Sequence, residues 1–224
     1  MTSITDYALL ANAVYDDDPR CDGFVRTAFR PGGNSGLQAA VFTKNGKTIV
    51  TFKGTSAAMD VVADLKLGVG INTSLFSEGE QFVAQHASGD GIVVTGHSLG
   101  GAIAQTVGNR RRLPFVSFNA PGVAIIASQN LGDINPILGA VRVAGGAIGA
   151  IRHPMQTMRD MGSAFHDSLG TNYRLSGDLV SQIGLHYGPI VNLEASGDPR
   201  HQHRMGTMLE VLGAGSAGQI DFPV

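Results

Sequence analysis

The sequence predicts an α/β fold in which helices flank a mostly parallel central sheet and an antiparallel hairpin forms its N-terminal part. An Asn-Gly pair at 45–46 separates two β-rich runs, 37–43 and 48–53, and this is the strongest hairpin signal in the chain. Further along, short apolar runs at 92–95 and 115–118 are joined by a helical segment, which is the spacing of a βαβ unit. Because such a unit requires parallel strands, we expect both kinds of strand pairing in one sheet.

The remaining elements follow from periodicity and capping signals. Ser3 and Asp6 have the spacing of a capping box, which predicts a first helix over residues 3–15. The other expected elements are a strand at 24–29, helices at 57–67, 77–87 and 100–111, strands at 173–175 and 190–193, and a helix around 205–212.

The length and composition are those of one globular domain, which we expect to span residues 1–224. Within it, residues 122–170 are apolar and contain no convincing strand, so we expect a mainly helical insertion that caps the site. A long segment of this kind is usually functional or loosely ordered. The alternative is that these residues belong to the ordinary core.

Charge and targeting signals exclude several classes of protein. The formal net charge is −2, which gives no basis for nucleic-acid binding. Cys21 is the sole cysteine, so an internal disulfide is excluded. Residues 1–10 lack the basic and apolar regions of a secretory signal. We therefore expect a cytoplasmic protein, or one exported by a bacterial route that uses no signal peptide.

The sequence Gly-His-Ser-Leu-Gly at 96–100 is the central chemical motif. It matches G-x-S-x-G, with a strand expected before it and a helix after it, as a nucleophile elbow requires. Glycine on both sides leaves room for a sharp turn, and the helix directs its first N–H groups toward the reacting carbonyl. Ser98 is therefore the candidate nucleophile, and the fold is expected to be of the α/β-hydrolase type. A chance match in a glycine-rich chain is the alternative.

A serine nucleophile needs a base and an acid, which in α/β-hydrolases follow it in the order acid, histidine. Asp178 is the preferred acid because it stands just past an expected strand, whereas Asp198 belongs to a Gly-Asp-Pro turn. Three histidines follow Asp178, namely His186, His201 and His203. We predict that His203 is the base, because it borders the packed helix around 205–212 and so has the rigid mounting that a base needs.

The oxyanion formed during acyl transfer needs two donors. The N–H of Leu99, directly after the nucleophile, is expected to be one. Thr55, in the loop after the 48–53 strand, is expected to supply the other through its N–H or its hydroxyl. The alternative is that Thr55 simply caps the helix that follows.

Four stretches in this order resemble the class 3 lipase family, the group that includes fungal triacylglycerol lipases; they are 49–55, 93–102, 118–122 and 176–180. The resemblance implies a triad of Ser98, Asp178 and a late histidine, Thr55 at the oxyanion position, and a lid at 56–67. It also implies that His186, which precedes Tyr-Gly, is not the catalytic histidine. Several features depart from the fungal enzymes, including Lys53 where arginine is usual and the absence of a signal and disulfides, and these point to a bacterial lipase or phospholipase relative.

Together these observations predict a carboxylic ester hydrolase that acts through an acyl-enzyme and needs no cofactor or metal. The expected substrate is a lipid or other ester, met at a membrane surface. The alternatives are an acyltransferase, a thioesterase or a peptidase on the same triad, or a binding protein with a dead site. Relatives that act as bacterial effectors have an immunity protein, so the resemblance also raises that partner.

Overall fold

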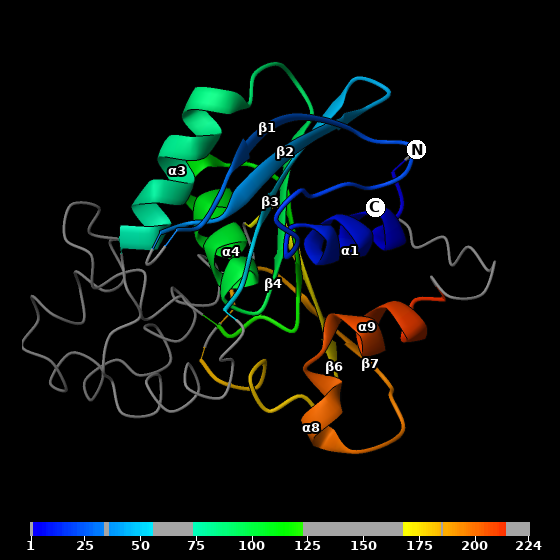
Figure 1. The fold of residues 1–224 in the computed structure, drawn as a ribbon. Coiled ribbons are helices and arrows are strands. Elements are labelled where there is room, and N and C mark those ends of the chain that lie inside the picture. The colour runs from blue at the N-terminus through cyan, green and yellow to red at the C-terminus, as the bar shows by residue number, and fades with distance from the viewer. Residues whose placement is uncertain (1, 34–35, 56–73, 123–167, 185, 214–224) are drawn as a thin grey trace, which may run out of the picture.

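The computed structural model describes residues 2–33, 36–55, 74–122, 168–184 and 186–213 (Figure 1). Within them, one sheet of seven strands follows the order of the chain from β1 to β7. Its strands are β1 (Val25–Arg30), β2 (Ala39–Lys44), β3 (Lys47–Phe52), β4 (Ile92–His97), β5 (Phe115–Phe118), β6 (Thr171–Leu175) and β7 (Ile190–Leu193). The first three strands pair antiparallel, and β3 to β7 pair parallel, which confirms the predicted fold class.

The turn between β2 and β3 forms where the Asn-Gly pair predicts it. Asn45 and Gly46 have φ angles of 52° and 77°, and the flanking residues Lys44 and Lys47 are paired across the hairpin. Positive φ at both central positions is the requirement of a type I′ turn, which explains the preference for asparagine and glycine there.

Helices cover both faces of the sheet. One face carries α1 (Ile4–Ala13) and α9 (Met205–Val211), and the other carries α3 (Ser74–His86) and α4 (Leu99–Arg111) (Figure 1). The capping box at the start of α1 forms as predicted. Successive residues of β2 point to opposite faces: Val41 packs with the α3 and α4 side chains, and Phe42 packs with those of α1 and α9. The result is a three-layer α/β/α sandwich.

The structure adds one helix that the sequence does not predict, and some predicted elements lie outside the described residues. A short helix, α8 (Pro199–Gln202), follows Asp198, where the sequence predicts only a turn. Proline at the first helical position after aspartate is a helix-start signal that could have indicated it. The helix at 57–67, the lid at 56–67 and nearly all of the 122–170 insertion lie outside the described residues. Among the helices described, none combines the length and apolar character needed to cross a membrane.

Candidate active site

The Gly-His-Ser-Leu-Gly segment makes the sharp strand-to-helix turn expected of it. Ser98 lies between the last residue of β4 and the first of α4, with φ 56° and ψ −128°. A side chain at Gly100 would collide with the backbone of Phe52 and Lys53, and one at Gly96 would collide with Gly100 itself. The motif glycines are therefore required by close backbone packing, and this packing holds Ser98 in its unusual conformation.

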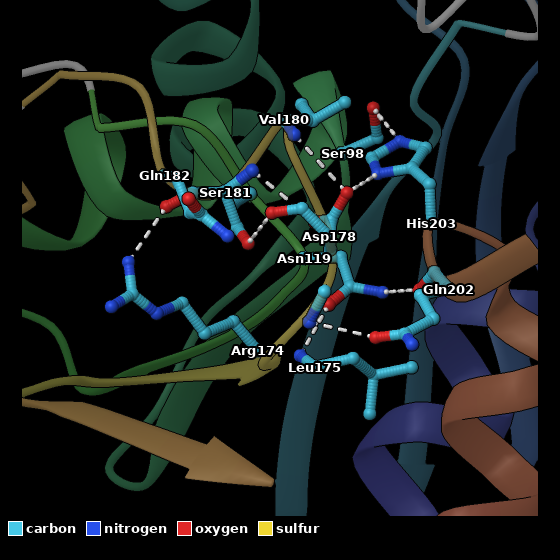
Figure 2. Close-up of polar contacts among 12 residues, drawn as sticks. Ser98, Asn119, Arg174, Leu175, Asp178, Val180, Ser181, Gln182, Gln202 and His203 are labelled. Carbon is cyan, nitrogen blue, oxygen red and sulfur yellow. Dashed lines mark hydrogen bonds and ion pairs between the residues drawn. The ribbon is translucent and has the colours of Figure 1, made fainter. Parts of the chain in front are cut away.

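Three side chains form a continuous hydrogen-bonded series at this turn (Figure 2). His203 Nε2 lies 2.9 Å from Ser98 Oγ, and His203 Nδ1 lies 2.9 Å from Asp178 Oδ1. An ionised carboxylate only accepts, so Nδ1 carries the hydrogen and Nε2 is left to accept from the Ser98 hydroxyl. Ser98 and Asp178 lie in loops at the carboxyl ends of β4 and β6, and His203 lies beyond the end of β7. This is the edge at which α/β sheets assemble their sites.

The surroundings of Asp178 keep its carboxylate ionised although its side chain is buried. Burial alone raises the pKa, but the hydrogen bond and charge of His203, together with hydrogen bonds from Ser181 and from the Val180 N–H, outweigh it, and the net pKa is lowered. The two backbone donors lie 3.2 and 3.1 Å from the carboxylate oxygens. A fixed negative charge at this point suits an acid that orients an imidazole and stabilises its protonated form.

Two further side chains connect the loop of Asp178 to the loop of His203. The Asn119 side chain accepts from the Leu175 N–H at 2.9 Å and donates to the Gln202 carbonyl at 2.8 Å. The Gln202 side chain accepts from the Gly177 N–H at 2.7 Å (Figure 2). The residues just before Asp178 are thus held against the residue just before His203. Sequence reasoning missed both, although Asn119 follows a buried strand directly.

The structure separates the other candidates from this series. His201 is exposed on α8, and Asp198 precedes that helix, where its carbonyl accepts from the His201 N–H at 2.9 Å. His186 Nε2 lies 2.8 Å from the carbonyl of Ala120, and burial lowers the pKa of its imidazole. Of the three late histidines, His203 is therefore the one placed beside Ser98.

Of the two predicted oxyanion residues, Leu99 follows Ser98 directly in the chain and Thr55 belongs to a loop that packs against Ser98. Leu99 is the first residue of α4, so its N–H is among those without an acceptor inside the helix. Thr55 follows Gly54, and a Cβ built on Gly54 would stand 3.1 Å from the Ser98 Cβ, which places this loop against the nucleophile. Among the described residues, no three His, Cys, Asp or Glu side chains gather as metal ligands would.

Comparisons with known proteins give the chain its family. Residues 6–183 match the family model of the Tle-like phospholipase domain. The extracellular phospholipase A1 of Serratia liquefaciens is 26% identical over 147 residues, which are 63% of this chain and 46% of that protein. The chain thus spans about half the length of this curated relative.

Solved structures similar to this one include two fungal lipases. A triacylglycerol lipase from Penicillium expansum has a TM-score of 0.44 and 17% identity, over 89% of this chain and 83% of that one. A lipase from Rhizopus microsporus var. chinensis has a TM-score of 0.47 and 18% identity, over 87% and 74% of the two chains. The family model, by contrast, covers well over half of the sequence, and the protein therefore belongs to the family of Tle-like phospholipase domains.

Proposed function

We propose that this protein hydrolyses a carboxylic ester of a phospholipid through an acyl-enzyme formed on Ser98. The observation that carries the proposal is the hydrogen-bonded series from Ser98 through His203 to Asp178, at the turn that opens α4. The family of the chain and the named activity of its Serratia relative favour a phospholipid over other esters.

In the proposed reaction the Ser98 oxygen attacks the ester carbonyl while its proton moves to His203 Nε2. Asp178 holds Nδ1–H and stabilises the imidazolium that forms. The N–H of Leu99 and the Thr55 donor stabilise the oxyanion of the tetrahedral intermediate. When this intermediate collapses, the ester C–O bond breaks, the alcohol leaves with the proton from His203, and the acyl group stays on Ser98. Water then attacks the acyl-enzyme by the same steps in reverse and releases the fatty acid.

The test compares wild-type protein with Ser98→Ala on phospholipid, triglyceride and p-nitrophenyl ester substrates, and labels both with a fluorophosphonate probe. We expect labelling and fatty-acid release from phospholipid by the wild type, and neither by Ser98→Ala. Ser74→Ala, which removes a hydroxyl at the exposed start of α3, serves as the matched control. A labelled wild type that releases no acid, or transfers the acyl group only to an added alcohol, would contradict hydrolysis.

The setting of the reaction stays a prediction. A membrane surface as the place of catalysis, an immunity protein as partner, and a cytoplasmic or signal-less exported location are expectations from the sequence. Titrating a short-chain phospholipid through the concentration at which it aggregates would test the first, since an interfacial enzyme gains activity only with the aggregated lipid.

A further inference from the structure

The residue before the nucleophile makes contacts that the triad does not account for. His97 ends β4, and its side chain is 6% exposed. Its Nε2 lies 2.6 Å from the backbone carbonyl of His203, and its Nδ1 lies 2.9 Å from the Tyr15 hydroxyl. One buried ring therefore connects the backbone of the proposed base to a tyrosine 82 positions away in sequence.

The chemistry of these partners fixes the hydrogen on each atom. The His203 carbonyl only accepts, so His97 Nε2 must carry a hydrogen and donate it. Burial and the neighbouring His203 lower the pKa of His97 to about 3, so its ring is neutral at ordinary pH and Nδ1 has a free lone pair. The Tyr15 hydroxyl therefore donates to Nδ1, and this bond selects the tautomer that can hold His203.

Tyr15 is itself held in place. The buried Gln38 amide donates to the carbonyls on both sides of it, at 2.7 Å to Val14 and 3.1 Å to Asp16. A Cβ built on Gly54 would meet the Tyr15 hydroxyl oxygen at 2.5 Å, so this oxygen lies against the loop that carries Thr55. The tyrosine thus touches the proposed oxyanion loop on one side and His97 on the other.

We propose that Tyr15 and His97 are positioning residues, which fix the His203 backbone relative to Ser98 through the hydrogen bonds from Tyr15 Oη to His97 Nδ1 and from His97 Nε2 to the His203 carbonyl. The inference rests on the proposed function, because it assigns these residues to the same triad. His203 lies between the short α8 and α9, and the helices alone leave its carbonyl without a described backbone donor. The contact with His97 anchors that segment directly to the residue preceding the nucleophile.

The test measures kcat, KM and melting temperature on one p-nitrophenyl ester for Tyr15→Phe, His97→Gln and His97→Leu. A displacement of about 1 Å at a reacting group costs about 10²-fold, so we expect His97→Leu to lower kcat by about that factor with KM unchanged. His97→Gln retains an N–H that can reach the His203 carbonyl, and we expect it to restore most of kcat. Tyr15→Phe should lower kcat about tenfold, because without the hydroxyl only part of the His97 population carries its hydrogen on Nε2 and holds His203 in position.

The matched control is Tyr7→Phe, which removes a phenol hydroxyl on α1 within the same hydrophobic cluster that Tyr15 packs against. We expect it to keep wild-type kcat. Wild-type kcat in folded Tyr15→Phe, or equal losses in His97→Gln and His97→Leu, would overturn the inference. If His97→Leu does not fold, Tyr15→Phe against Tyr7→Phe decides alone. A wild type that the fluorophosphonate fails to label would instead overturn the proposed function, so the two failures are distinct.

Discussion

Ser98 adopts a backbone conformation that few residues with a side chain occupy. Its φ of 56° and ψ of −128° are of the kind that cost on the order of 1–3 kcal/mol, and they persist only where the surroundings impose them. Here the surroundings are the close backbone packing at Gly96 and Gly100, where a Cβ would not fit. The strain is therefore localised at one residue, and its effect is to direct the hydroxyl toward His203.

Asp178→Asn should lower both activity and stability. An amide in place of an orienting carboxylate favours the wrong imidazole tautomer, and in a serine protease such a change lowers kcat by about 10⁴, so we expect a loss of this order. Because the folded pKa of Asp178 is below its ordinary value of 3.8, the carboxylate contributes stability that is present above 3.8 and is lost as pH falls through the folded pKa. Urea unfolding at pH 7 and at about pH 3 measures this. A stability gap between wild type and variant that did not narrow at the lower pH would contradict it.

His203→Ala and His201→Ala form a matched pair, because the two imidazoles stand two positions apart in the chain. Catalytic triads act as a unit, and loss of the base in a serine protease costs about 10⁶ in kcat, so the proposed role of His203 predicts a comparable loss for His203→Ala. His201 is exposed on α8, and its replacement should leave kcat near that of the wild type. Steady-state rates on one ester decide; an inactive His201→Ala beside an active His203→Ala would move the base two residues back.

Thr55→Val tests the oxyanion loop, since valine keeps the shape and the backbone N–H but loses the hydroxyl. Removal of one oxyanion donor typically costs about 10²–10³ in kcat, so a hydroxyl that serves as donor predicts a loss of this order with KM unchanged. Thr43→Val makes the same change on β2, outside the site, and is the control. Wild-type kcat in Thr55→Val would leave the N–H as the proposed donor and exclude the hydroxyl.

At the scale of elements, α9 anchors the segment that holds His203. α9 begins two residues after His203, and its Met208 is fully buried in the cluster that includes α1. Met208→Ala should cost about 2–5 kcal/mol in the free energy of unfolding, because it leaves a cavity in this cluster. Glu210→Ala, on the exposed side of α9, should leave stability unchanged. Denaturant midpoints compare the two; equal midpoints would mean that α9 is not part of the cooperative core.

Some elements could be predicted from sequence because their causes are local. The Asn-Gly turn and the capping box of Ser3 and Asp6 each act within a few residues, and both form as expected. The motif around Ser98 is a short pattern that also forms its expected turn, although its Gly100 packs against the distant backbone of Phe52. The contacts of Asn119 and Gln202 could not be predicted, because they join segments 83 positions apart and depend on the register of α8. The same holds for Tyr15 and His97, where no pattern in either segment indicates the other.

At the scale of the molecule, both faces of the sheet contribute to one site. The hydrophobic cluster beside α1 and α9 and the one beside α3 and α4 share the strands that lead to Ser98. Unfolding of the described part should therefore be a single transition, in which helix content and ester hydrolysis are lost together. Urea titrations followed by circular dichroism and by residual activity test this, and activity lost at a clearly lower urea concentration would indicate that the site opens before the core.

The proximity of α1 and α9 brings an early part of the chain against a late one. A ribosome that has released the chain only as far as β6 has exposed Ser98, and also Tyr15 and His97, but neither Asp178 nor His203. Such a nascent chain has the proposed nucleophile without its base. If the chain hydrolyses phospholipids, the cell that makes it contains an active enzyme only after synthesis has passed α9. An inhibitory protein could therefore bind the nascent chain before the proposed site is complete.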